Sequence, residues 1–297
     1  MAETATTYSD YTREMRCRFI AYRRAHYPLE DDLFDPRREY VFKAEYDFCN
    51  LSEMDLEELL PRGRRHMWFR SMTSSQALAV SVFGTMIKRA GLVLLVDLVD
   101  EGGGPLLPGF ALADEPVFDY PVTTLSERTS TSVDLFLPGK SGHVAIECKL
   151  MEREVGACSR VPRFCKGEYV PNKCWLTQRG AAYWQHIPKL FTWDAHQPQI
   201  PCPIRRPYQL MRTLLGAAID EQGHIYGIPT ALLVYDNNNP FFADGREAEL
   251  FRRVQAAVRP PASFKRISWQ AIVRALKVQG GYEDLVDYVD EKYGIAA

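Results

Sequence analysis

The sequence predicts an α/β protein in which helices flank a mixed central sheet. An apolar helical pattern is followed by three strand patterns, then by a second helix and a fourth, fully apolar strand, which gives the order α-β-β-β-α-β. Further helical patterns precede and follow this core, so extra N- and C-terminal helices are expected. A chain of 297 residues can bury a substantial core.

The helical patterns also suggest how the chain is divided. We expect an N-terminal helical extension over residues 1–70, a core over 71–245 and a C-terminal helical extension over 246–297. No repeat or low-complexity tract separates these parts, and we therefore predict that they pack as one compact domain.

The first elements are helices. Residues 8–27 and 53–62 have amphipathic patterns, and Ser52 is the expected N-cap of the second helix. The strongest helical pattern lies in residues 73–92, where Ser and Thr residues precede apolar positions at helical spacing. A Gly- and Pro-rich loop and a strand within 116–125 follow.

A hairpin comes next, and the elements after it complete the predicted core. They are helices at 174–191 and 207–219 and a buried strand at 230–236. Helical pieces near 246–258, 268–278 and 281–292 end the chain.

Composition and charge argue against several classes of protein. The net charge is -2 and the pI about 6.3, so any contact with DNA must come from local basic patches. The N-terminal stretch has no apolar signal-peptide core, and Lys88 and Arg89 interrupt the most apolar stretch, residues 74–96. We expect a cytoplasmic protein without a membrane span. No Gly-rich phosphate loop is present, so no nucleoside triphosphate is expected.

The segment DLFLPGKSGHVAIECKL, residues 134–150, has the pattern of a β-hairpin. Side chains alternate between the faces of a strand, so Asp134, Glu147 and Lys149 share one face. The apolar face holds Val133, Leu135, Leu137, Val144, Ile146, Cys148 and Leu150. A turn centred between residues 140 and 141 places Asp134 opposite Glu147. The charged face is either a solvated outer face or the lining of a cleft.

Two opposed carboxylates repel each other unless a positive charge lies between them. Mg²⁺ prefers oxygen ligands such as carboxylates, waters and phosphates. We therefore predict that Asp134 and Glu147 hold Mg²⁺, with Mn²⁺ as a substitute, and that Lys149 orients or activates an attacking water. A similar triplet, Asp290-Glu291-Lys292, lies in a polar helical tail without a partner strand and is not assigned to a site.

Asp134 followed by Glu147-Cys148-Lys149 resembles the motif of the PD-(D/E)XK, or restriction-endonuclease-like, nuclease superfamily. The stretches SSQALAVSVFG, ERTSTSVD, IECKL, CWLTQRGAAYW and YQLMR resemble a bacterial subgroup of it, over roughly residues 70–240. Val133 replaces the proline of the superfamily's name. The resemblance implies a Mg²⁺-dependent endonuclease that cuts double-stranded DNA, with the Cys148 backbone carbonyl as a third metal ligand.

The resemblance also suggests further site residues. Gln209 and Arg212 are one helical turn apart, and they would orient the water or phosphate and pair with a phosphate. The alternative is an ordinary helix with a solvated Arg212. Many members add an acid from the first helix, where this chain has Gln76. The acids near the following strand that could replace it, or could lie on the surface, are Glu115, Asp119 and Glu127.

Two basic groups are predicted to contact DNA phosphates, although each also fits a solvated surface. The first is Arg64 and Arg65 with Trp68 for base stacking. The second is Arg160, Arg163, Lys166 and Lys173.

Cys158, Cys165 and Cys174 lie in one loop, with Cys148 or Cys202 as a possible fourth metal ligand. Their spacing lacks the tight Cys pairs of most structural zinc sites. We therefore expect free, partly buried thiols, with structural zinc or an iron–sulfur cluster as the alternative.

Three functions stay open at this point. They are a Mg²⁺-dependent DNA endonuclease, a DNA-binding protein that keeps the fold but cuts only with a partner or not at all, and a structural α/β domain. Double-strand cleavage would favour a homodimer, because each strand needs an active centre unless one site cuts twice.

Overall fold

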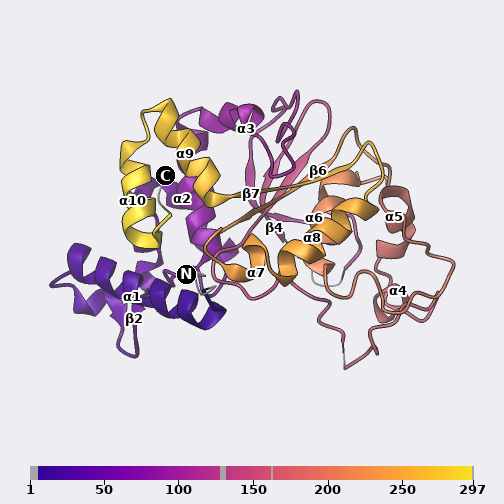
Figure 1. Ribbon diagram of the computed structural model, residues 1–297, viewed down its shortest axis with the longest axis horizontal. Helices are drawn as coiled ribbons and strands as arrows, with labels where there is room; N and C mark the ends of the chain where they lie inside the picture. Colours follow the sequence, from indigo (N-terminus) through magenta and orange to yellow (C-terminus); the bar gives the residue numbers. More distant parts are fainter. Residues whose placement is uncertain (1–5, 128–131, 162, 296–297) are drawn as a thin grey trace, which may run out of the picture.

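The computed structural model describes residues 6–127, 132–161 and 163–295. Its central sheet has the strand order β3-β4-β5-β6-β7, with helices on both faces (Figure 1). The strands are β3 Val117–Pro121, β4 Ser132–Leu137, β5 Val144–Cys148, β6 Thr230–Tyr235 and β7 Ser263–Ser268. The pairs β3–β4 and β4–β5 are antiparallel, whereas β5–β6 and β6–β7 are parallel. The sheet is therefore mixed, and the predicted fold class is confirmed.

The helices follow the predicted order. They are α1 Tyr8–His26, α2 Ser75–Lys88, α3 Leu94–Asp97, α4 Trp175–Gln178, α5 Tyr183–Leu190, α6 Tyr208–Ala218, α7 Pro240–Ala243, α8 Arg246–Ala257, α9 Trp269–Gln279 and α10 Glu283–Tyr293. The order α2, β3, β4, β5, α6, β6 is the α-β-β-β-α-β core predicted from the sequence. Ser74 caps α2 by accepting a hydrogen bond from the Ala77 N–H, as its Ser-rich start indicates.

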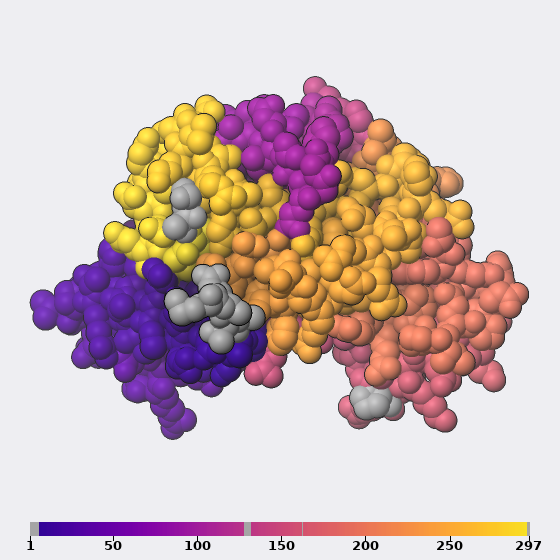
Figure 2. Space-filling model, in the orientation of Figure 1, coloured from indigo at the N-terminus to yellow at the C-terminus, as the bar shows by residue number. Residues whose placement is uncertain are grey.

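The N-terminal part has short elements between α1 and α2. They are β1 Phe34–Asp35, β2 Arg38–Phe42 and the 3₁₀ helices η1 Asp31–Leu33, η2 Ala44–Asn50, η3 Met54–Leu59 and η4 Arg62–Arg64; η5 Gly91–Val93 follows α2. The first of these elements, from η1 to η2, lie with α1 in the indigo lobe, which a notch separates from the salmon lobe carrying α4 and α5 (Figure 2).

Three local predictions were wrong. Residues 53–62 form the 3₁₀ helix η3 rather than an α-helix, and Ser52 does not cap it, because Glu53 is the N-cap residue. The helix expected at 174–191 is split into α4 and α5, because Gly180 adopts a left-handed φ of +89°. Strand β7 was missed in the C-terminal segment, since its adjacent charges, Lys265 and Arg266, obscure the alternation of a strand.

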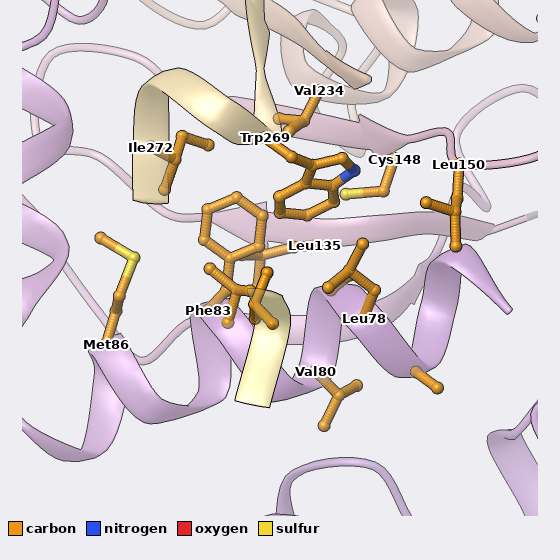
Figure 3. Packing of buried hydrophobic residues seen from close by; sticks show 14 of the residues in the cluster. Leu78, Val80, Phe83, Met86, Leu135, Cys148, Leu150, Val234, Trp269 and Ile272 are labelled. Atoms are coloured by element: carbon orange, nitrogen blue, oxygen red, sulfur yellow. The ribbon is translucent and has the colours of Figure 1, made fainter. Parts of the chain in front are cut away.

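Two hydrophobic cores lie on opposite faces of the sheet. The first packs α2, α9 and α10 on the face that carries Leu135 and Ile146, and the second packs α5, α6 and α8 on the other face. Phe83 of α2 and Trp269 of α9 meet in the first core, with ring centroids 5.6 Å apart (Figure 3). Alternation correctly assigned the apolar hairpin residues to the first core except for Val133, which packs in the second. This break in the alternation lies near Asp119, whose φ is +48°.

The C-terminal helix α10 is not the polar tail expected from its sequence. Lys292 is fully buried, and its Nζ donates to Asn50 O at 2.9 Å, to Asn50 Oδ1 at 2.8 Å and to Tyr288 Oη at 2.7 Å. Burial lowers the pKa of Lys292 well below its ordinary value. This lysine therefore joins the C-terminal helix to the N-terminal part.

Across the described ranges, no single helix is both long and apolar enough to cross a membrane. The segment Ser75–Lys88 with Gly91–Asp97 passes by length and composition only as a pair bent by 111°.

Candidate active site

The hairpin β4–β5 brings the predicted charged residues together at the end of β5. Leu135 pairs with Ile146, and Leu137 pairs with Val144. The midpoint of each pair lies between residues 140 and 141, which is the predicted centre of the turn. Asp134 Oδ2 accepts a hydrogen bond of 2.7 Å from the Cys148 N–H on the neighbouring strand. The predicted centre of the turn is therefore confirmed, but the ladder ends at the Leu135–Ile146 pair and does not include Asp134 and Glu147. Beyond it, the Asp134 carboxylate is held against β5.

Glu147, Lys149 and Gln209 form a closed group of side chains. Lys149 Nζ lies 2.9 Å from Glu147 Oε1 and 3.1 Å from Gln209 Oε1, and Gln209 Nε2 donates to Glu147 Oε1 at 2.6 Å. The second carboxylate oxygen of Glu147, Oε2, is buried, and no hydrogen-bond donor in the described part of the chain reaches it. A buried carboxylate oxygen without a donor is costly unless a cation binds it.

Burial and the neighbouring charges shift the pKa values in this group. Burial raises the pKa of Asp134 well above its ordinary value, and the nearby Glu147 raises it further. For Lys149, burial opposes the charged form, but Glu147, Glu152 and Asp134 outweigh it and raise the pKa of the ammonium. Lys149 is therefore a stable cation that cannot act readily as a general base.

The backbone directly after β5, at Lys149 and Leu150, is anchored by elements far away in the sequence. The Lys149 N–H donates to Val234 O of β6 at 2.8 Å, and Trp269 Nε1 of α9 donates to Lys149 O at 3.1 Å. Tyr11 of α1 donates to Leu150 O at 3.0 Å. These bonds fix the direction in which the Lys149 side chain leaves the strand.

The charged face lines a cleft of about 680 Å³ instead of forming an outer sheet face. Asp134, Glu147 and Lys149 lie on one side, and residues of α6, of the start of α2 and of the segment 63–68 form the other walls. The first turn of an α-helix carries unpaired N–H groups and partial positive charge, so α2 adds to the attraction for anions.

The first predicted basic group lies in this cleft. Trp68 is exposed enough to stack on a base, at 39 % of its surface. Arg64 is fixed by bonds to the carbonyls of Phe118 and Asp119 in β3. Arg65 is engaged instead in the protein interior, with a 3 % exposed side chain and a 2.6 Å ion pair to Asp47.

Gln209 and Arg212 both reach the cleft from α6, as their spacing predicts. Arg212 is buried, with its guanidinium 5.7 Å from the Tyr208 ring centroid. Its Nε has no acceptor among the described residues. A buried arginine with an unused donor beside a cleft is suited to binding a phosphate, and the solvated Arg212 considered above is excluded.

Of the three acids suggested near β3, one lines the cleft. Asp119 does so, and burial raises its pKa while Ser132 and Arg64 lower it. Glu115 is exposed before β3, and Glu127 accepts a hydrogen bond from Tyr208. Neither of these two is among the residues that line the cleft.

Two cleft residues, Glu152 and His66, were missed in the sequence. Glu152 accepts hydrogen bonds from Ser75 Oγ at 2.6 Å and from the Leu150 N–H at 2.5 Å. His66 donates its backbone N–H to Gln76 Oε1 at 2.9 Å. The acid three residues after Lys149 was the available signal for Glu152, whereas His66 had none because the fold alone brings it near β5.

The second basic group and the cysteine loop lie elsewhere. Arg160, Arg163, Lys166 and Lys173 are not among the residues that line the cleft. Cys158, Cys165 and Cys174 surround a separate small cavity together with Cys202. The Cys148 side chain packs beside Trp269 in the first core (Figure 3) and is unavailable to that loop.

The donor set of the cleft fits a hard divalent cation. Two carboxylates project from adjacent strands, and one of them has a buried oxygen without a protein donor. Mg²⁺ commonly takes one or two protein carboxylates and completes its shell with water and phosphate. No three His, Cys, Asp or Glu side chains within 6–127, 132–161 and 163–295 form a metal-binding group by themselves. A two-carboxylate site of this kind does not require a third.

The fold and the site define a restriction-endonuclease-like α/β protein. The chain belongs to the REase-ARP family, described as Restriction Endonuclease associating with ARP, whose sequence profile matches residues 17–294. Searches of curated proteins and of solved structures gave no significant match.

Proposed function

We propose that the chain is a Mg²⁺-dependent endonuclease of the PD-(D/E)XK type that hydrolyses phosphodiester bonds of double-stranded DNA. The observation that carries the proposal is the buried Glu147 Oε2, which has no protein donor and lies beside Lys149 and the Asp134 carboxylate. Membership of a restriction-endonuclease family supports the same reaction.

Asp134 and Glu147 would hold Mg²⁺, with the Cys148 carbonyl as the proposed third protein ligand. When bound, the ion would offset phosphate charge and lower the pKa of a water. Lys149 would orient that water by donating to it, since its pKa is raised and it keeps its protons. Gln209 would keep Glu147 and Lys149 in position through the two hydrogen bonds it makes with them.

Phosphate binding would fall to the basic residues of the cleft. Arg212 has an unused Nε, and Arg64 is already fixed to β3. The second basic group, which includes Lys173, lies outside the cleft and stays a predicted contact with DNA phosphates. Replacing Arg212 with Gln should lower the salt dependence of DNA binding by about one phosphate contact. An unchanged slope would remove Arg212 from the interface.

Plasmid cleavage with Mg²⁺ tests the activity. The native chain should nick or linearise plasmid DNA, Lys149→Ala should lose the activity, and the exposed Lys277→Ala should retain it. Equal cleavage by the native chain and Lys149→Ala would exclude the assignment. Gel filtration of the DNA complex would show whether two chains assemble to cut both strands, as a homodimer would.

A second function is favoured by the family description, which names an association with ARP. We propose as the alternative that the chain binds DNA and cuts only together with such a partner. In that case the isolated chain should bind Mn²⁺ and DNA without cutting, and Glu147→Gln should weaken the Mn²⁺ binding. An isolated chain that binds DNA but no Mn²⁺ would instead indicate a DNA-binding protein without catalytic function.

A further inference from the structure

The long connection between β5 and α6 needs an additional restraint. The described residues of 151–174, which leave out residue 162, contain no helix or strand, and the short helices α4 and α5 follow (Figure 1). Ordered loops of more than about 15 residues without secondary structure are uncommon, because few contacts offset the entropy lost on ordering them.

Four cysteines of this connection face one cavity. Cys158, Cys165 and Cys174 come from the long loop, and Cys202 comes from the segment before α6. The cavity measures about 20 Å³, and all four thiols are free. The fold thus selects Cys202 over Cys148 as the fourth cysteine, although 27 residues separate it from Cys174 in the sequence.

Backbone amides lie next to three of the four sulfurs in a repeated arrangement. The Gly167 N–H donates to Cys165 Sγ at 3.2 Å, and Gly167 has a left-handed φ of +82° that favours glycine. Burial raises the pKa of the Cys158 and Cys202 thiols, and the backbones of Arg160 and Ile204 lower it in part. In each case the donor is two residues after the cysteine. An amide donor stabilises the thiolate, which is the form that binds metals.

Main-chain bonds hold the two cysteine segments side by side. The Cys158 N–H donates to Arg205 O at 2.8 Å, and the Cys202 N–H donates to Gly167 O at 2.8 Å. Tyr169 and Gln199 exchange two further main-chain bonds, of 2.9 and 2.8 Å. The backbones of Cys158 and Cys202 are thus held in place by main-chain contacts, independently of their side-chain rotamers.

We propose that Cys158, Cys165, Cys174 and Cys202 bind one structural zinc ion. Four thiolates in tetrahedral geometry are a common donor set of structural zinc. Binding would release the four thiol protons to solvent and form four zinc–sulfur bonds. The ion would restrain the connection that leads into α6, and hence the helix that presents Gln209.

The sulfur atoms must turn toward one another to close this site. As they stand, no three metal-ligand side chains in the described ranges form a metal-binding group. A cysteine sulfur moves between staggered positions by rotation about a single bond, and rotations of this kind would close the site. Zinc with four thiolates carries a net charge of about -2, and the nearby Arg160 and Arg205 line the same cavity and offset it.

Elemental analysis of the purified full-length protein tests the proposal. We expect about one zinc per chain after gel filtration in excess Mg²⁺, and loss of this zinc in Cys158→Ser and Cys174→Ser. Cys17→Ser, which alters an exposed cysteine of α1, should retain it. Lys149→Ala should retain it as well, so that failure of the nuclease proposal leaves this result unaffected.

A second measurement covers the case in which the serine variants do not fold. Titrating the native protein with an organomercurial should release zinc, detected by a chromogenic chelator, as four protected thiols react. Native protein with no zinc and with all thiols reacting freely would overturn the proposal. Iron with visible absorbance in place of zinc would overturn it too.

Discussion

Two buried lysines each follow an acid by two positions, yet their surroundings are opposite. Lys149 follows Glu147 and lies among carboxylates, which raise its pKa despite burial. Lys292 follows Asp290 and lies among tyrosine rings and amide oxygens, and burial lowers its pKa. The Nζ of Lys292 is 4.8 Å from the Tyr288 ring centroid. The charges that the fold places around a lysine, rather than the triplet itself, decide its protonation state.

The largest expected difference between the two triplets is in catalysis. Glu147→Gln should lower the rate of Mg²⁺-dependent cleavage by about 10²- to 10³-fold, because it removes a proposed metal ligand and the ion pair of Lys149. The matched change Asp290→Asn in the other triplet should leave the rate within about twofold. Initial rates of plasmid nicking measure both. Equal losses in the two variants would end the distinction between the triplets.

The next effect is on stability and concerns the other lysine. Lys292→Ala should lower the free energy of unfolding by about 2–4 kcal/mol, because it leaves Asn50 O and Oδ1 without their donor and opens a cavity. Urea denaturation measures the change. Lys277→Ala, on the exposed side of α9, should change it by less than about 0.5 kcal/mol. A Lys292→Ala protein as stable as the native chain would show that Lys292 is not buried.

The third prediction concerns how stability depends on pH, and it tests the difference in pKa between Lys292 and Lys149. Lys292 has a lower pKa in the folded protein than its ordinary 10.5, so the unfolded chain binds more protons between those two values. Stability should therefore rise with pH through this window, by about 1.4 kcal/mol for each unit of pKa difference.

Lys292→Met should remove that rise, and urea midpoints measured up to pH 10 would show it. For Lys149 the sign is reversed. Its folded pKa lies above 10.5, so its contribution is complete below that pH and is lost only at higher pH. An equal slope for native protein and Lys292→Met would mean that Lys292 titrates normally.

Local patterns predicted the part of the site that lies within the hairpin. The turn and the alternation of side chains fix the register of residues 135–137 on 144–146, so Asp134 and Glu147 could be placed at the same end of the hairpin from the sequence. The spacing of Gln209 and Arg212 likewise placed both on one face of α6. Strand register within a hairpin and the shared face of a helix both depend on residues that are close in the sequence.

Contacts between distant segments could not be predicted in this way. Lys292 meets Asn50 across 242 residues, and nothing in the polar pattern of α10 indicates a buried amine. Cys202 lies beside the cysteine loop, and His66 lines the cleft, only because the fold brings distant segments together. Strand β7 was missed because Arg266 is buried in it, with its charge satisfied by Glu101 and by main-chain carbonyls.

The hydrogen bond from Trp269 to the Lys149 carbonyl can form only late in synthesis of the chain. During synthesis, Lys149 leaves the ribosome 120 residues before the tryptophan that anchors its backbone, and Asp134 and Glu147 leave earlier still. A nascent or truncated chain therefore carries the full set of acids and the lysine without the anchor. The proposed nuclease activity should accordingly be absent from chains that end before α9.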